Sequence, residues 1–121
     1  MTSMPNRIKL MSDYECWCLW DMDATKYNRS YNIDPEKLPL SKALKLSLSD
    51  WENDFDQTLD KADHANIGFS DEQKFNAFYE RGWELIERLR SELPGTEFWY
   101  MDRRFSEPLQ QRPNSTLPKL R

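Results

Sequence analysis

Few side chains in this sequence have the type and spacing that active-site chemistry requires. Cys16 and Cys18 form a C-x-C pair, and His64 is the only histidine. With an aspartate, these three residues could bind zinc, but structural zinc sites usually have two separated ligand pairs, and a second pair is missing. No nucleophile motif accompanies His64. We therefore interpret the cysteines as ordinary buried or half-buried thiols and His64 as an exposed loop residue, and we predict no metal and no cofactor.

Paired carboxylates are the second candidate for chemistry. They form three pairs: Asp13 and Glu15, Asp21 and Asp23, and Asp50 and Asp54. A glycosidase needs two carboxylates that face a sugar cleft, which a chain of this size could barely build. The glycine-containing pattern of a calcium loop is absent. Two interpretations remain open for these groups, a solvated acidic surface and a recognition surface for a basic partner. Neither interpretation implies an enzyme.

Two tryptophans are interleaved with the first carboxylates. Trp17 and Trp20 stand three residues apart, beside Tyr14. Large aromatic side chains of a small domain usually belong to its core, but tryptophan and tyrosine are also enriched at binding hot spots. The neighbouring carboxylates must stay near water, which keeps a binding role open. The candidate partner-binding residues are Asp13, Tyr14, Glu15, Trp17, Trp20, Asp21, Asp23, Asp50 and Asp54.

The segments around these residues predict a short strand near each end of a domain. Residues 7–11 alternate polar and apolar side chains, with Ile8 and Leu10 on one face, as is typical of a strand. Residues 96–105 predict a second strand, covered on both sides because both of its faces are apolar. Parallel pairing of the two strands, with the helices as the connection between them, is the simplest way to form a sheet. Two strands make a poor sheet, so a third is expected from residues 12–34 or from another chain.

Two long helices are predicted between the strands. The first begins with Ser41 as its N-cap and runs for roughly 20 residues, and the second begins at Ser70 with a capping box. Their apolar stripes are Leu44, Leu48, Trp51, Phe55 and Leu59 in the first helix, and Phe75, Phe78, Tyr79, Gly82, Ile86, Leu89 and Leu93 in the second. Because Gly82 lies in a buried stripe, we expect another side chain to pack closely on it, and we take Trp51 as that side chain.

Together these elements predict an α+β fold. It is a small helix-rich domain in which two long antiparallel helices pack on a small two- to three-stranded sheet, in the order β-loop-α-α-β. The sequence contains no valine, which argues against a large sheet. At 121 residues, one domain is expected. We assign residues 1–6 to a flexible leader, 7–105 to the domain and 106–121 to a disordered tail that is rich in proline and polar residues.

Charge and hydropathy restrict the class of partner. The formal net charge is −4, with the acidic excess in the body and a basic excess in residues 96–121. An acidic body repels phosphate backbones, so nucleic-acid binding is not expected. It suits a basic protein such as a nuclease. The sequence has neither an apolar run near the roughly 20 residues of a membrane span nor the apolar part of a signal peptide. A cytoplasmic protein with reduced cysteines is therefore expected.

Three segments, residues 8–21, 38–60 and 68–95, together resemble a family of small bacterial proteins. Some of them are encoded beside polymorphic or contact-dependent inhibition toxins and are taken to be their immunity proteins. The resemblance is strongest at Asp13-Tyr14, Leu19-Trp20-Asp21, Leu38-Pro39-Leu40-Ser41, Trp51 and Gly68-Phe69. Relatives carry glycine in the place of Glu15 and proline in the place of Cys18, so the resemblance does not fix the geometry of this turn. It implies no catalytic residue and no cofactor.

The resemblance implies an immunity protein that neutralises a cognate, basic toxin domain by covering its active site, without chemistry of its own. Two alternatives from other classes remain. One is an adaptor or self-associating module without a toxin partner, and the other is a small enzyme or metal protein that uses Cys16, Cys18 and His64. A toxin-like open reading frame next to the gene would distinguish the immunity protein from the adaptor. Metal analysis of the purified protein would test the third alternative.

Overall fold

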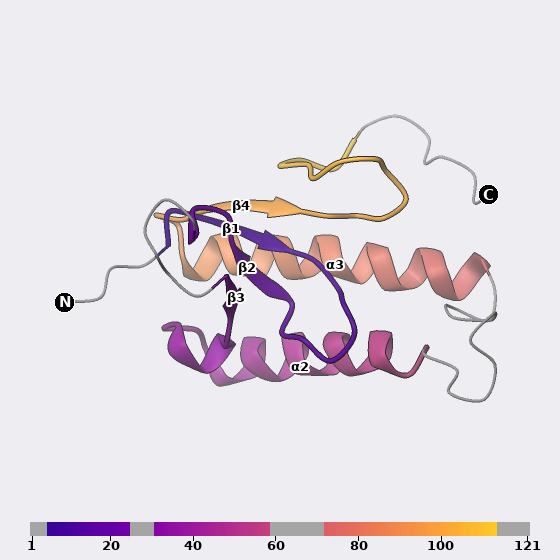
Figure 1. The fold of residues 1–121 in the computed structure, drawn as a ribbon, viewed down its shortest axis with the longest axis horizontal. Helices are drawn as coiled ribbons and strands as arrows, with labels where there is room; N and C mark the ends of the chain where they lie inside the picture. The colour runs from indigo at the N-terminus through magenta and orange to yellow at the C-terminus, as the bar shows by residue number, and fades with distance from the viewer. Residues whose placement is uncertain (1–4, 25–30, 59–71, 114–121) are drawn as a thin grey trace.

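A computed structural model describes residues 5–24, 31–58 and 72–113 of the chain (Figure 1). The elements are β1 (Arg7–Leu10), β2 (Leu19–Asp21), β3 (Asn32–Ile33), the 3-10 helix η1 (Pro35–Lys37), α2 (Lys42–Asp56), α3 (Glu72–Glu92) and β4 (Glu97–Tyr100). The predicted α+β class and the order of its main elements are confirmed. His64, Leu59 and the expected helix start at Ser70 lie outside the described residues.

The sheet has the strand order β3-β2-β1-β4. β1 and β4 pair in parallel, as the sequence predicts, with Ile8 opposite Phe98 and Leu10 opposite Tyr100. β2 pairs antiparallel with both β1 and β3. The segment 12–34 therefore supplies two strands of its own, and the sheet is slightly larger than the predicted two or three strands.

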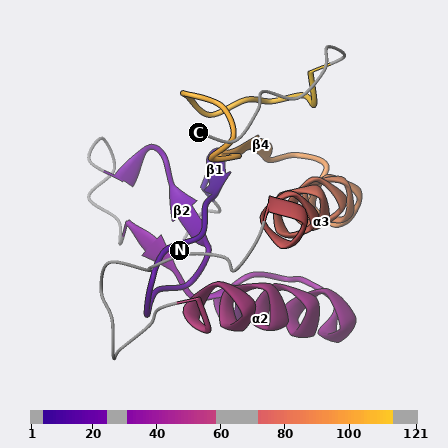
Figure 2. The same ribbon diagram turned by 90° about the vertical axis from the view of Figure 1, so that its right-hand side faces the viewer.

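Helices α2 and α3 run antiparallel and cover one face of the sheet (Figures 1 and 2). Ser41 caps α2 as predicted, because its hydroxyl accepts a hydrogen bond of 3.1 Å from the Leu44 amide. The apolar stripe of α2 is buried at Leu44, Leu48, Trp51 and Phe55. The buried face of α3 consists of Phe78, Tyr79, Gly82, Trp83, Leu85, Ile86 and Leu89, of which the sequence analysis missed Trp83 and Leu85.

The two helices meet through stacked aromatic rings. Trp51 of α2 lies parallel to Phe78 of α3, with ring centroids 4.4 Å apart and an interplanar angle of 7°. The indole N–H of Trp51 donates a hydrogen bond of 2.9 Å to the Phe78 carbonyl. A buried indole nitrogen therefore keeps its hydrogen bond while the ring fills the space between the helices.

The close neighbour of Gly82 is not the predicted Trp51. A Cβ atom at this position would lie 1.9 Å from the hydroxyl oxygen of Tyr100 in β4. That hydroxyl donates a hydrogen bond of 2.9 Å to the Tyr79 carbonyl. The absence of a side chain at position 82 thus lets α3 approach the sheet, not the other helix.

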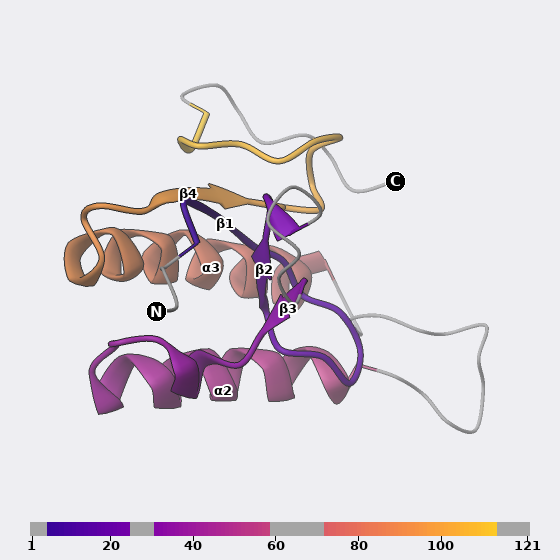
Figure 3. The ribbon, with the colours of Figure 1, turned by 60° about the vertical axis from the view of Figure 1, so that its left-hand side comes forward.

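The C-terminal part differs from the predicted strand and tail. β4 ends at Tyr100, and the chain then turns back along the side of β4 away from α3 (Figure 3). Within the expected disordered tail, Leu109 packs against the core and forms an antiparallel bridge with Tyr100, and Arg112 pairs with Glu80 of α3. Residues 114–121 lie outside the described residues. The predicted two-sided cover of β4 is partial, since Phe98 is buried but Trp99 is only half-buried.

Candidate functional site

The loop between β1 and β2 rests on the C-terminal half of α2. The Met11 amide donates to the Cys18 carbonyl and closes the loop at 2.9 Å. Two further loop amides bond to carboxylates of α2: that of Glu15 to Asp56, and that of Cys18 to Glu52, both at 2.9 Å. The acidic residues of the helix therefore satisfy backbone donors that the loop could not satisfy itself.

Tyr14 anchors this loop and is half-buried. Its ring stacks on Phe55 of α2, with the centroids 4.5 Å apart. Its hydroxyl forms a hydrogen bond of 2.8 Å with the Thr58 hydroxyl. The neighbouring side chains of Asp13 and Glu15 remain exposed. The structure thus gives Tyr14 a packing role and leaves the two carboxylates in water.

Glu15 holds an unusual backbone conformation. Its φ is 58°, and it is the only non-glycine residue with positive φ in the described parts of the chain. The left-handed region costs about 1–2 kcal/mol for a residue with a Cβ atom. Glycine would adopt this conformation without that cost. The loop therefore keeps an acidic side chain at a position whose backbone favours glycine.

Trp17 is the exposed aromatic residue of the loop, with 44% of its surface accessible. The Asn32 side chain of β3 fixes its backbone from both sides: it accepts from the Trp17 amide at 3.1 Å and donates to the Trp17 carbonyl at 2.8 Å. Tyr31, beside Asn32, is 51% exposed. We refer to Asp13, Glu15, Trp17 and Tyr31 as the loop surface.

Acidic groups dominate the electrostatics below the loop surface. The pKa of Glu52 is raised, first by burial and then by the charges of Asp56 and Asp34. Burial also raises the pKa of Cys16, with smaller contributions from the nearby carboxylates, and raises that of the fully buried Cys18 well above its ordinary value. Both thiols therefore stay protonated near neutral pH, which makes them poor nucleophiles and poor metal ligands.

The structure separates the other candidate residues from the loop surface. Trp20 and Asp21 are 7% and 1% exposed, so neither offers a contact surface in this conformation. Asp23 forms an ion pair of 2.7 Å with Arg7. Asp50 and Asp54 are exposed on α2, and Asp54 pairs with Arg81 of α3.

Comparison with known families decides what kind of protein carries this loop surface. A model of the Serratia CdiI immunity protein-like family matches residues 6–103. The chain belongs to this family. The match spans all four strands and both long helices, and it includes the whole loop between β1 and β2. A comparison with curated proteins gave no match.

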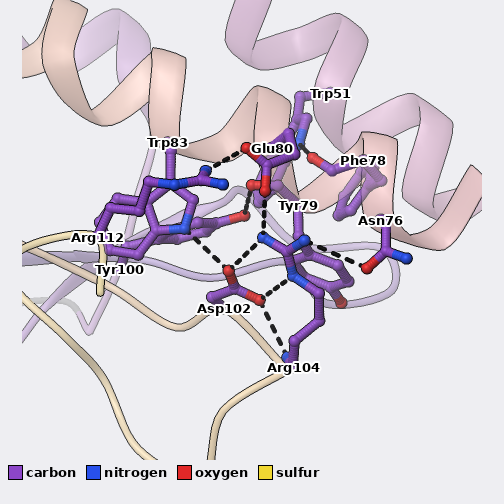
Figure 4. A network of polar contacts seen from close by, with 10 residues as sticks. All are labelled: Trp51, Asn76, Phe78, Tyr79, Glu80, Trp83, Tyr100, Asp102, Arg104 and Arg112. Atoms are coloured by element: carbon purple, nitrogen blue, oxygen red, sulfur yellow. Dashed lines mark hydrogen bonds and ion pairs between the residues drawn. The ribbon is translucent and has the colours of Figure 1, made fainter. Parts of the chain in front are cut away.

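This member of the family also contains a polar cluster that the sequence analysis missed (Figure 4). Asp102 is fully buried and accepts a hydrogen bond of 2.9 Å from the Trp83 indole. Arg104 binds the same carboxylate at 2.9 and 2.7 Å, and its guanidinium lies 3.0 Å from Glu80 of α3. The D-x-R spacing was the available signal. The paired charges attach the chain after β4 to α3, so we interpret the cluster as structural.

The remaining predictions concern metals and membranes. Among the described residues, no group of three or more His, Cys, Asp and Glu side chains could hold a metal ion. His64, the histidine of the metal hypothesis, lies outside the described residues. Over the same described parts, neither long helix has the length and apolar character needed to cross a membrane.

Proposed function

We propose that this chain is an immunity protein that binds one cognate toxin domain and neutralises it by occluding its active site. Membership of the immunity-protein family supports a binding function without chemistry. The observation that carries the proposal is the exposed Trp17, held on a fixed backbone in the same loop as two exposed carboxylates, Asp13 and Glu15. An apolar ring beside charges is typical of an interface centre with a polar rim.

The fixed backbone of Trp17 favours binding. Most tryptophan side chains of this fold are buried, so a ring with 44% exposure leaves unsatisfied apolar area at the surface. The Asn32 side chain already orders the backbone on both sides of the ring. Binding therefore costs less conformational entropy than it would in an unanchored loop. Trp17 is accordingly our proposed hot spot.

Charge supports a basic partner. The chain has a net charge of −4, and the loop adds Asp13 and Glu15 to the acidic residues of α2. Opposite charge accelerates association and orients the two proteins before contact. A basic toxin domain, such as a nuclease, fits this surface. Asp50 and Asp54 on α2 form a second proposed contact region, in which the Arg81 ion pair offsets one charge.

Binding kinetics with the toxin domain encoded beside this gene test the proposal. We expect Trp17→Ala to raise the dissociation rate and to weaken binding by at least about 2 kcal/mol, the threshold of a hot spot. Glu107→Ala is the control, because Glu107 is exposed and lies after β4, outside both proposed contact regions. Equal affinities of the two variants would exclude the loop surface as the contact region.

The electrostatic part of the proposal has a separate readout. Glu15→Lys and the double variant Asp50→Lys with Asp54→Lys should lower the association rate at low salt, and the difference should shrink as salt rises. Glu107→Lys, at an exposed position after β4, is the control. No salt dependence of association would contradict the basic partner. No binding at all would leave the adaptor hypothesis.

A further inference from the structure

The pairing of β1 with β4 is extended toward the loop surface by a side chain. A backbone hydrogen bond of 2.8 Å from the Met101 amide to the Leu10 carbonyl continues this pairing one residue beyond β4. Such bonds recur at every second residue of a parallel pair, so the next position joins Arg103 to Ser12. There the Arg103 guanidinium donates to the Ser12 carbonyl at 2.7 Å. The Arg103 side chain thus carries the sheet contact into the loop between β1 and β2.

The other side of the loop base is held in the same manner. Asn32 of β3 accepts a hydrogen bond from the Trp17 amide and donates one to the Trp17 carbonyl. Ser12 and Trp17 each lie one residue beyond the backbone hydrogen bond that closes the loop. The strand order β3-β2-β1-β4 is therefore repeated at the base of the loop by Asn32, Trp17, Ser12 and Arg103.

Arg103 can hold the loop because its own neighbours are fixed. Asp102 and Arg104, on either side of it, are 0% and 9% exposed and form an ion pair of 2.7 Å (Figure 4). The Asp102 carboxylate also accepts a hydrogen bond from the Trp83 indole of α3. The Asp102 carbonyl accepts one from the Phe105 amide at 2.8 Å, which closes a turn around Arg103. The buried polar cluster therefore anchors Arg103 on α3.

We propose that Arg103 is a positioning residue of the loop surface, which holds Ser12 and thereby orients Trp17 without touching the toxin. The inference rests on the proposed function, in which Trp17 contacts the partner. A loop that is tied on both sides of its base loses less conformational entropy on binding. A positive charge is unsuited to direct contact with a basic toxin. Support of the loop is the role that fits both the contact and the charge of Arg103.

A double-mutant cycle of Arg103→Met and Trp17→Ala tests the proposal, with binding kinetics of the cognate toxin domain as the readout. Arg103→Met alone should raise the dissociation rate about tenfold, because loss of a charge-assisted hydrogen bond loosens the loop. In the Trp17→Ala background it should change affinity by no more than about twofold, because Arg103 acts through Trp17. Arg112→Met is the matched control, since it removes the same charge from the same segment but pairs with Glu80 of α3.

The signs of these effects separate positioning from charge. Removal of a positive charge by itself should speed association with a basic toxin, so Arg112→Met should bind no more weakly than the unchanged chain. An equal loss of affinity for Arg103→Met in both backgrounds would mean that Arg103 contacts the toxin, and would overturn the proposal. Full affinity of Arg103→Met, in a protein whose binding Trp17→Ala weakens, would overturn it while leaving the proposed function intact.

Hydrogen exchange in the free chain provides a readout that needs no toxin. Arg103→Met should accelerate exchange of the Trp17 and Cys18 amides about tenfold and leave the Ile86 amide, in the middle of α3, unchanged. Unchanged exchange at Trp17 would overturn the proposal. Equal acceleration at Ile86 would also overturn it, because Arg103 would then stabilise the whole domain. Absence of toxin binding together with the expected exchange pattern would contradict the immunity function but not the hold of Arg103 on the loop.

Discussion

At the scale of single residues, the loop keeps Glu15 in a conformation that glycine would adopt at lower cost. The φ of 58° belongs to the left-handed region. We expect Glu15→Gly to raise the free energy of unfolding by up to about 1 kcal/mol, because relief of strain exceeds the added entropy of the unfolded chain. Chemical denaturation would measure it. Asp13→Gly is the control and should lower stability, since φ at position 13 is not positive.

A destabilised Glu15→Gly variant would show that the Glu15 side chain stabilises the fold and is not retained for binding. Strained backbone is common in functional loops. Here the strain is observed directly, as the positive φ of Glu15. The sequence signals this conformation only through the resemblance described above, in which glycine is expected at this position. Without it, nothing in the residues 12–18 distinguishes a left-handed turn from any other.

Glu52 connects the loop to α2 and makes stability depend on pH. Burial raises its pKa in the folded protein. The protonated form is therefore favoured by folding: its contribution is complete below the ordinary value of 4.5 and is lost as pH rises through the raised folded value. We expect Glu52→Gln to match the unchanged chain at low pH and to exceed its stability at neutral pH. Unfolding free energies measured across this range test the sign.

Glu52→Ala is the companion variant. It removes the acceptor of the part-buried Cys18 amide, which should cost about 1–3 kcal/mol at every pH. If alanine and glutamine gave the same stability profile, the hydrogen bond to Cys18 would contribute nothing. If glutamine were less stable at neutral pH, the ionised carboxylate would be favoured by folding, which would contradict the raised pKa.

At the scale of elements, the contact of α3 with β4 depends on Gly82. An alanine Cβ would lie 1.9 Å from the Tyr100 hydroxyl oxygen, so the ring must move and lose its hydrogen bond to Tyr79. We expect Gly82→Ala to destabilise the protein by about 1–3 kcal/mol through overpacking. Thermal unfolding would show the loss. Gly95→Ala is a matched control, because nothing lies within 4 Å of a Cβ atom there.

Tyr100→Phe refines this prediction. In the Gly82→Ala background it removes the closest atom of the clash, so the double variant should lose less stability than the two single variants combined. Strict additivity would mean that the two residues do not interact. A neutral Gly82→Ala would mean that the helix and strand are farther apart than the structure shows.

The helices could be predicted from the sequence because their apolar residues recur with a clear period. The stripe of Leu44, Leu48, Trp51 and Phe55 and the Ser41 cap are as expected. The partner of Gly82 was missed, because periodicity identifies a buried face but not the element that covers it. A strand was expected within residues 12–34 or from another chain, but β2 could not be placed, since its three residues are all buried and show no alternation. Leu109 was missed because a single bridging residue leaves no pattern.

At the scale of the whole molecule, the sequence predicted an acidic binding protein but not the residues that reach the surface. Trp17 and Trp20 are equivalent candidates in the sequence, yet one is 44% exposed and the other 7%. The loop that carries Trp17 and the short strand that carries Trp20 have no repeating apolar pattern that would show which side chain is buried. Asp56 was not among the candidate binding residues, although its carboxylate accepts a hydrogen bond from the Glu15 amide. The contact between loop and helix is long-range and only the fold reveals it.

The most direct test of the account is protection of cells that express the cognate toxin domain, which the proposed function expects to be encoded beside this gene. Co-expression of the unchanged chain should restore growth, and Glu107→Ala, at an exposed position after β4, should do so equally well. Trp17→Ala should fail to protect while remaining folded and present at the same level. Protection by Trp17→Ala as strong as by the unchanged chain would contradict the role of the loop surface, and no protection by the unchanged chain would contradict the immunity function itself.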